Sequence, residues 1–214
     1  MSELPNETLV GVVLAGGLSR RMGGGDKALL ALGGATMLDL VLARFSPQVT
    51  QTVINANGDA SRFARYGLAV VGDTVDGFVG PLAGVLAGMR WAGANAPAAS
   101  HILTVSSDAP FVPHDLRQRL VAGLAAGQGR IALAASGGHR HPVIGLWPVA
   151  LADDLEEALH DGLRKVLAWT DRHGTVLVDF PFVNIGGEAV DPFFNANTPE
   201  EMDEARRLLA RLTP

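Results

Sequence analysis

The chain has 214 residues, of which 48% are hydrophobic and 18% are charged, and its formal net charge is −5. This apolar fraction and small net charge exclude disorder for the bulk of the chain and provide enough apolar material for a packed core. The absence of cysteine excludes disulfides, zinc–thiolate sites, iron–sulfur clusters and thiol catalysis. Glycine is abundant, at 26 residues, which predicts many tight turns and backbone-lined surfaces.

Neither a membrane nor a nucleic acid is indicated as a partner. The longest stretch without Asp, Glu, Lys or Arg, residues 91–107, is interrupted by Gly, Asn, Pro and His and does not resemble a membrane span. The N-terminus contains Glu3 and Glu7 without a basic segment, so a signal peptide is not expected. An isoelectric point of about 5.6 argues against nucleic-acid binding. We therefore expect a cytoplasmic protein.

Short apolar runs alternate with helical patterns along the chain. Residues 9–14 (LVGVVL) form a run rich in β-branched side chains that is too short for a helix, and they predict a strand. The patterns next predict a helix over 36–45 with Thr36 as N-cap, strands over 52–55 and 69–71, and a helix over 82–92. A strand over 101–105, a helix from 113 to 124 and strands over 131–135 and 143–147 follow. The last predicted elements are helices over 150–159 and 164–170, a strand over 175–180 and a helix over 199–212. This alternation predicts an α/β sandwich with a mainly parallel sheet. We expect one domain over residues 1–214, with 1–8 as a loose tail.

Polar or glycine-rich tripeptides follow three of the predicted strands. They are residues 15–17 (AGG), 55–57 (NAN) and 106–108 (SSD). Ligands of open parallel sheets bind beyond the carboxyl ends of the strands. The three tripeptides therefore mark the candidate site.

The loop over residues 14–27, LAGGLSRRMGGGDK, combines glycine clusters with three cations, Arg20, Arg21 and Lys27. Glycine permits positive φ and close backbone approach, so successive N–H groups can line an anion site, and Arg and Lys suit a polyphosphate. Lys27 is followed by Ala28, so the loop is not a Walker motif, and it does not match G-x-G-x-x-G either. A flexible surface loop with solvated charges is the less favoured interpretation, because the glycines and cations coincide directly after a strand.

Two aspartates end predicted strands. An isolated Asp108 would more often cap a turn, but Pro110 and Pro113 make this turn rigid, and the glycine-rich loop is expected at the same edge of the sheet. A Mg²⁺ ion held by one or two carboxylates and substrate phosphates needs such an arrangement. Asp73, which ends another short predicted strand, is the second candidate, with a structural role as its alternative.

The segment LAGGLSRRMGGGDKALLAL resembles the nucleotidyltransferase signature of the molybdenum cofactor guanylyltransferases, the MobA family. Further blocks follow in family order: NAN at 55–57, GD at 72–73, GPLAG at 80–84, SDAPFVP at 107–113, HPVIGLW at 141–147 and DPFFNANTPEEM at 191–202. The loop alone indicates only the wider nucleotidyltransferase class, and the His-Pro-Val and FFNANTPEE blocks make the narrower match. The resemblance covers nearly the whole chain.

The resemblance implies a Rossmann-like three-layer sandwich of the nucleotide-diphospho-sugar-transferase type. It also implies the transfer of GMP from GTP to the terminal phosphate of molybdopterin carrying molybdenum, with release of pyrophosphate and with Mg²⁺ as cofactor. Transient contact with molybdopterin-delivering and acceptor proteins is a further implication. The implied site residues fall into groups: Leu14, Ala15, Gly16 and Gly17 on the guanine nucleotide; Lys27 on its phosphates; Asn55 and Asp73 completing the pocket; Asp108 on Mg²⁺; Arg21 against the triphosphate; Asn195 and Asn197 near the pterin. Lys27, Asp108 and Arg21 are the expected catalytic residues.

Several alternatives stay open at this point. Molybdopterin cytidylyltransferases and sugar-1-phosphate nucleotidylyltransferases have related loops, although Gly16 in LAGG favours guanine over the LAAG version of cytidylyl relatives. A nucleotide-binding module without activity is a second alternative, which the presence of both Lys27 and Asp108 disfavours. The basic cluster His139-Arg140-His141 either meets the pterin phosphate or is a solvated turn. No role is assigned to residues 183–190.

Overall fold

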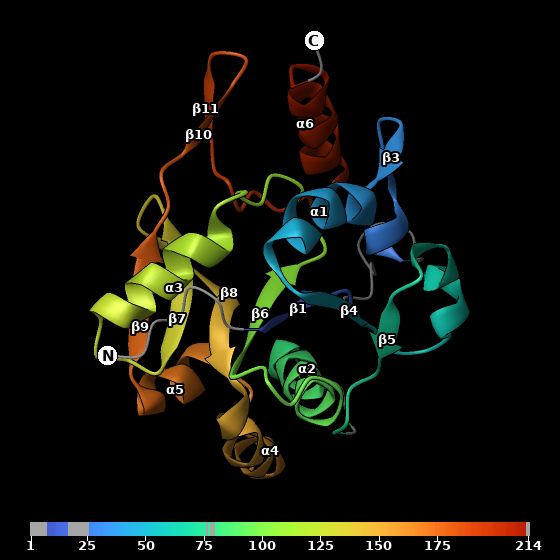
Figure 1. Ribbon diagram of the computed structural model, residues 1–214. Coiled ribbons are helices and arrows are strands. Elements are labelled where there is room, and N and C mark those ends of the chain that lie inside the picture. Colours follow the sequence, from blue (N-terminus) through green and yellow to red (C-terminus); the bar gives the residue numbers. More distant parts are fainter. Residues whose placement is uncertain (1–7, 17–25, 76, 78–79, 213–214) are drawn as a thin grey trace.

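The computed structural model describes residues 8–16, 26–75, 77 and 80–212 (Figure 1). Seven of its strands form one sheet, in the order β5-β4-β1-β6-β8-β7-β9. Their bounds are β1 (Leu9–Leu14), β4 (Gln51–Asn55), β5 (Ala69–Val71), β6 (His101–Ser106), β7 (Ile131–Ser136), β8 (His139–Pro148) and β9 (Thr175–Asp179). Within this sheet β8 is antiparallel to both of its neighbours, and the other pairs are parallel. The predicted mainly parallel sheet is confirmed.

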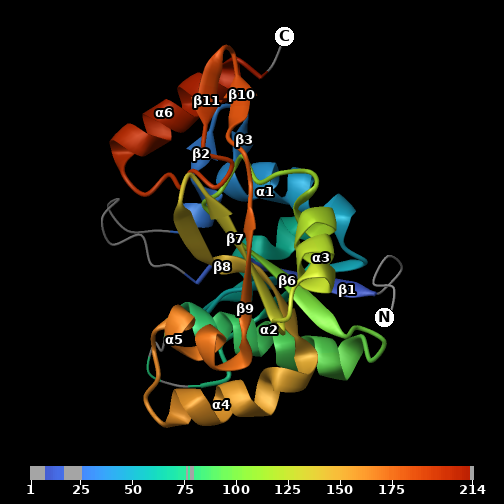
Figure 2. The same ribbon diagram turned by 90° about the vertical axis from the view of Figure 1, so that its left-hand side faces the viewer.

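Helices cover both faces of the sheet, which gives three layers (Figures 1 and 2). The α-helices are α1 (Met37–Phe45), α2 (Pro81–Asn95), α3 (Leu116–Ala126), α4 (Ala152–His160), α5 (Val166–Thr170) and α6 (Pro199–Ala210). Short 3₁₀ helices are η2 (Lys27–Leu29), η3 (Ser46–Gln48), η4 (Ala60–Tyr66), η5 (Val149–Leu151) and η6 (Asp171–His173). The core on one face includes α2, α4 and α5, and the core on the other face includes α1 and α3. No helix among the described residues is long and apolar enough to cross a membrane.

The central strand β1 shows why an uncharged run becomes a buried strand. Val10 and Val12 pack into the core on the α2 face, while Leu9 and Val13 pack into the core on the α1 face. A strand covered on both faces has no polar alternation, and it therefore reads as a continuous apolar run in the sequence.

Two helices begin where their capping residues predict. Thr36 accepts a hydrogen bond from the Asp39 amide, and the Asp39 carboxylate accepts one from the Thr36 amide, which is a capping box. Thr198 and Glu201 form the same reciprocal pair at the start of α6. These side chains satisfy backbone N–H groups that have no partner inside the helix.

Some element bounds differ from the expectations. The helix expected from residue 113 begins at Leu116, because residues 113–115 form a turn in which the Leu116 amide donates to the Pro113 carbonyl at 3.3 Å. The strand expected over residues 143–147 extends back to His139, and its pairing with β7 shifts register between Leu133 and Ala134. That irregular pairing breaks the period-2 pattern by which a strand is recognised in sequence.

Two short hairpins were not predicted. They are β2 (Ala31–Leu32) with β3 (Ala35–Thr36), and β10 (Val183–Ile185) with β11 (Glu188–Val190). Strands of two or three residues are too short to show alternation. Gly186 and Gly187 form the turn of the second hairpin with φ of 59° and 89°, which favours glycine.

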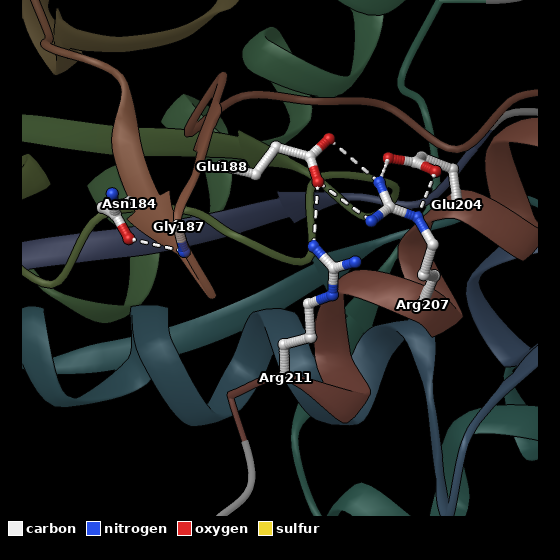
Figure 3. A network of polar contacts seen from close by, with 6 residues as sticks. All are labelled: Asn184, Gly187, Glu188, Glu204, Arg207 and Arg211. Carbon is white, nitrogen blue, oxygen red and sulfur yellow. Dashed lines mark hydrogen bonds and ion pairs between the residues drawn. The ribbon is translucent and has the colours of Figure 1, made fainter.

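The two hairpins lie beside α6 at one end of the molecule (Figure 2). Their apolar residues share a separate core with that helix, formed by Leu32, Met37, Phe111, Ile185, Val190, Ala196, Met202, Ala205 and Leu208. Figure 3 shows that Glu188 accepts hydrogen bonds from Arg207 and Arg211 of the C-terminal segment, at 2.9 and 3.0 Å. Residues 183–190, which had no assigned role, therefore hold α6 in place.

Candidate active site

Three strand ends meet at the carboxyl edge of the sheet. Leu14 is in register with Asn55 on one side and with Ser106 on the other. The chain continues in the same hydrogen-bonding pattern beyond the strands, because the Ala15 amide donates to the Asn55 carbonyl at 2.8 Å and the Ser107 amide to the Leu14 carbonyl at 3.1 Å. The predicted convergence of the three tripeptides is confirmed for their described residues.

Lys27 and Asp108 face each other at this edge. Lys27 Nζ donates to Asp108 Oδ2 and to Asn197 Oδ1, both at 2.6 Å. The Lys27 and Asp108 side chains are 12% and 17% exposed. A charge-assisted hydrogen bond of this length between largely buried partners is strong. Two of the three expected catalytic residues are therefore in direct contact, together with a residue expected near the second substrate.

The Asp108 carboxylate is surrounded by further donors. Ser106 Oγ donates to its Oδ1 at 2.5 Å. In the amide orientation that satisfies both neighbours, Asn195 Nδ2 donates to the same oxygen and to the Phe193 carbonyl, each at 3.2 Å. The Ala196 amide donates to the Asp108 carbonyl, also at 3.2 Å. The segment after residue 191 is thus anchored on Asp108.

Asn55 and Asp73 form a second polar unit. Asn55 Nδ2 donates to Asp73 Oδ1 at 3.0 Å and to the Val71 carbonyl at 3.2 Å. Asn57 Nδ2 donates to Asp73 Oδ2 at 2.7 Å, and its own oxygen accepts from the Asp73 amide at 2.8 Å. Asp73 therefore orients both asparagines of the NAN block. The role of Asn57 was not anticipated from the sequence.

The first turn of α2 closes against this unit. A Cβ atom added at Gly84 would lie 2.2 Å from Asn55 Oδ1 and 2.9 Å from Leu14 Cδ2. Gly16 is also nearby, since a Cβ there would lie 3.8 Å from Asn55 Oδ1. Leu14, Gly16, Asn55 and Gly84 therefore form one wall of the site. The GPLAG block had marked Gly84 without showing what it contacts.

Arg62 joins the end of the glycine-rich loop to the NAN block. Its Nε donates to Asp26 Oδ2 at 2.5 Å, and its two Nη atoms donate to the carbonyls of Asp59 and Asn57, each at 2.6 Å. Asp26 directly precedes Lys27 in the sequence. Arg62 is thus a positioning residue that sequence reasoning missed, because no local motif surrounds it.

The other expected nucleotide residues have different environments. Leu14 is half-buried, Ala15 is buried and Gly16 is exposed. The Ala15 side chain belongs to the core, so this residue can meet a ligand only through its backbone. Gly17 and Arg21 lie outside the described residues, and their roles stay predictions.

The basic cluster at the β7–β8 turn divides into two parts. His139 and Arg140 are exposed, whereas His141 is half-buried and its Nε2 lies 2.6 Å from Ser136 Oγ. Burial lowers the pKa of His141 against the opposing effect of Asp191, and His139 lowers it further. The turn follows β7, which runs in the direction of β1, so it lies at the carboxyl edge too.

A second polar cluster lies on the α4 and α5 side of the sheet, where the exposed Asp154 side chain contacts the edge of the core. Asp154 Oδ1 accepts from Trp169 Nε1 at 2.7 Å and lies 2.8 Å from His173 Nε2. Trp147 is buried, stacks against Trp169 with centroids 6.3 Å apart and donates to Thr104 Oγ1 at 2.7 Å. None of these contacts includes a candidate site residue.

The donor set around Asp108 fits a hard divalent cation. Among the described residues no group of three or more His, Cys, Asp or Glu side chains could hold a metal. Asp108 instead combines one carboxylate with the neutral oxygens of Ser106 and Asn197 nearby. Mg²⁺ is commonly bound in this way, by one or two carboxylates, water and substrate phosphates.

Known proteins of similar sequence and fold identify the family of this chain. Residues 11–184 match the model of the MobA-like NTP transferase domain. A molybdenum cofactor guanylyltransferase of Bradyrhizobium is 51% identical over 211 residues, which are 98% of this chain and 97% of the relative. The crystal structure of molybdopterin-guanine dinucleotide biosynthesis protein A from Archaeoglobus fulgidus superposes with a TM-score of 0.71 at 23% identity, covering 94% of this chain and 99% of that one. A Mycobacterium tuberculosis protein crystallised in complex with manganese superposes with a TM-score of 0.63 at 20% identity, covering 94% and 98%. The chain belongs to the MobA-like NTP transferase family.

Proposed function

We propose that the protein transfers GMP from GTP to the terminal phosphate of molybdopterin carrying molybdenum, forming molybdopterin guanine dinucleotide and pyrophosphate. The observation that carries this proposal is the Lys27–Asp108–Asn197 contact at the carboxyl edge of the sheet. It occurs in a chain that is about half identical, over nearly its whole length, to proteins named as molybdenum cofactor guanylyltransferases. A cytoplasmic location, a single domain and transient contact with proteins that deliver or accept molybdopterin belong to the same proposal.

The wall formed by Leu14, Gly16, Asn55 and Gly84 offers a side-chain amide and backbone groups that can bind a nucleotide. Asn55 is 3% exposed and is held by Asp73, so its amide is preorganised. The backbone of residues 14–16 runs beside it. We assign the guanine nucleotide to this wall, with Gly17 contributing to it and Arg21 reaching the triphosphate.

The reaction needs positioning and charge neutralisation more than proton transfer. An oxygen of the molybdopterin phosphate attacks the α-phosphorus of GTP in line, the bond from that phosphorus to the bridging oxygen breaks, and pyrophosphate leaves. A phosphate nucleophile is already ionised near neutral pH, so no general base is required. Two anions must approach each other, and Lys27 supplies a cation at the point where they meet.

Asp108 is the residue that would hold Mg²⁺. When bound, the ion would neutralise charge on the phosphate oxygens of GTP. The manganese in the related fold supports the use of a divalent cation. Lys27 forms an ion pair with the Asp108 carboxylate. Phosphate oxygens give Lys27 alternative acceptors and leave Asp108 available to a cation.

Asn195 and Asn197 are assigned to the acceptor. They reach the Asp108–Lys27 pair from the C-terminal part of the chain, while the nucleotide wall comes from its N-terminal part. The two substrates would therefore meet at this pair. His139 and Arg140 are exposed at the same edge and are available to a phosphate of the acceptor.

Turnover with GTP and with CTP, measured side by side with molybdopterin and Mg²⁺, tests the proposal. We expect GTP to be preferred and Asp108→Asn to abolish most of the transfer while the fold stays intact. Asp154→Asn is the matched control, because Asp154 is also a hydrogen-bonded aspartate but lies in the polar cluster on the α4 and α5 side. Equal or better use of CTP would support the cytidylyltransferase alternative. Wild-type turnover of Asp108→Asn would remove Asp108 from the mechanism.

A further inference from the structure

A buried serine connects the β7–β8 turn to the segment that follows β11. Ser136 is the last residue of β7 and is fully buried. Its Oγ lies 2.6 Å from His141 Nε2 on β8 and 2.8 Å from Asp191 Oδ1. The nucleotidyl-transfer chemistry described above uses none of these three residues.

The chemistry of the groups fixes the direction of both hydrogen bonds. An ionised carboxylate can only accept, so Ser136 donates to Asp191 and must accept from His141 Nε2–H. Both the neutral tautomer with its proton on Nε2 and the protonated imidazole carry that donor. The chain His141 to Ser136 to Asp191 therefore persists in either charge state of the histidine.

Asp191, which is fixed by Ser136, also holds the residues that follow it by hydrogen bonds. Its Oδ1 also accepts from the Phe193 amide at 2.8 Å, and its carbonyl accepts from the Phe194 amide at 3.0 Å. The Phe193 ring lies 4.6 Å from the His141 ring, centroid to centroid, and 5.1 Å from that of Phe180. The turn over residues 191–194 is thus held by its backbone and by a buried side chain.

The next residues enter the candidate active site. Asn195 and Ala196 bond to Asp108, and Asn197 accepts from Lys27. The far end is fixed as well, since Glu201 Oε2 accepts from the Asn197 amide at 2.6 Å. Hydrogen bonds therefore fix the segment 195–197 at both ends, at the Asp191 turn before it and at the start of α6 after it.

We infer that Ser136, His141 and Asp191 are positioning residues that hold Asn195 and Asn197 on the Asp108–Lys27 pair, and so set the rate of transfer to the acceptor. This inference rests on the proposed function. The inference predicts a change in the transfer rate without a change in GTP affinity, because the Asn55 wall that we assign to GTP is built from other elements. Loosening the Asp191 anchor should lower kcat and leave GTP binding unchanged.

The test compares Asp191→Ala with Asp191→Asn. Alanine removes the acceptor of both the Ser136 and the Phe193 hydrogen bonds, whereas the asparagine carbonyl retains it. We expect kcat to fall about 10- to 100-fold in Asp191→Ala, as for a misplacement of about 1 Å, and to stay within about threefold of wild type in Asp191→Asn. The dissociation constant for GTP with Mg²⁺, measured by equilibrium dialysis, should stay within about twofold in both.

Asp154→Ala is the matched control for a general loss of stability. It breaks a similar contact between a carboxylate, a tryptophan and a histidine away from the site, and we expect its melting temperature to fall while its kcat stays near wild type. The inference is overturned if Asp191→Ala retains its kcat, if its GTP affinity falls as much as its rate, or if Asp154→Ala loses kcat to the same extent.

Amide hydrogen exchange tests the same anchor without any acceptor substrate. The Ala196 amide should exchange faster in Asp191→Ala than in wild type and at the wild-type rate in Asp191→Asn. Equal protection in all three proteins would overturn the positioning role. Absence of transfer by the wild-type protein would instead overturn the proposed function, and the exchange result would still stand.

Discussion

Replacing Gly84 by alanine tests whether the first turn of α2 shapes the nucleotide wall. The added Cβ would lie 2.2 Å from Asn55 Oδ1, where ordinary contacts begin at 3.4 Å, so the Asn55 side chain must move by about 1 Å. Its hydrogen bonds to Asp73 and to the Val71 carbonyl are already 3.0 and 3.2 Å long. A displacement of this size would break them and remove Asn55 from its oriented position.

Two opposing effects set the change in stability. Alanine in a helix interior gains about 1 kcal/mol over glycine, and overpacking costs about 1–3 kcal/mol. The free energy of unfolding should therefore fall by about 0–2 kcal/mol. If Asn55 binds the nucleotide as proposed, misplacing its buried amide costs about 1–3 kcal/mol, which corresponds to about 5- to 150-fold weaker GTP binding.

Gly88→Ala provides the control on the same helix. Its added Cβ would lie 2.6 Å from Val12 Cγ2 and 3.2 Å from Ile102 Cδ1, in the core rather than in the site. Urea denaturation should show similar losses of stability for both variants, while equilibrium dialysis with GTP should show weaker binding for Gly84→Ala alone. Wild-type affinity in Gly84→Ala, or equal weakening in both variants, would refute the assignment of this wall to the nucleotide.

Three further predictions concern charged groups. Lys27→Ala should lower the transfer rate by about 100-fold or more, because a cation is lost where two anions meet; unchanged GTP affinity and rate in steady-state kinetics would contradict its phosphate role. Arg62→Ala should lower the free energy of unfolding by about 1–3 kcal/mol in urea denaturation and weaken GTP binding, and a variant with normal affinity would show that the link from Asp26 to Asn57 is only structural. Burial holds the pKa of His141 below its ordinary 6.5 in the folded state, so the unfolded chain binds the proton more readily and stability should fall as pH drops below about 6.5. His141→Gln should lose this part of the pH dependence in thermal melts, and an unchanged profile would contradict it.

Much of the fold follows from local patterns in the sequence. The strand over residues 9–14 is buried on both faces, and this leaves a continuous apolar run that needs no tertiary information to recognise. Thr36 and Thr198 mark helix starts, because a cap satisfies backbone groups within three residues of itself. The hairpins over residues 31–36 and 183–190 escaped prediction, since their strands are too short to show a period and are stabilised by packing with α6.

The residue types of the site could also be predicted, because glycine, lysine and aspartate after strands have recognisable chemistry. Their contacts could not. Lys27 meets Asp108 and Asn197 across 81 and 170 positions of the chain, and Arg62 meets Asp26 across 36. Such pairs form only when the sheet brings strand ends to one edge, and no local pattern records them.

The sequence of this acidic, glycine-rich chain marked a candidate place for anionic substrates, since cations and glycines coincide directly after the first strand. Only the tertiary structure decided which side chains hold that place together. The hydrogen bond from Ser136 to Asp191 joins β7 to the segment between β11 and α6 that contains Asn195, and hydrogen bonds between distant elements depend on how the elements pack. Local propensity and motif chemistry therefore determined the elements and candidate groups, and packing determined their partners.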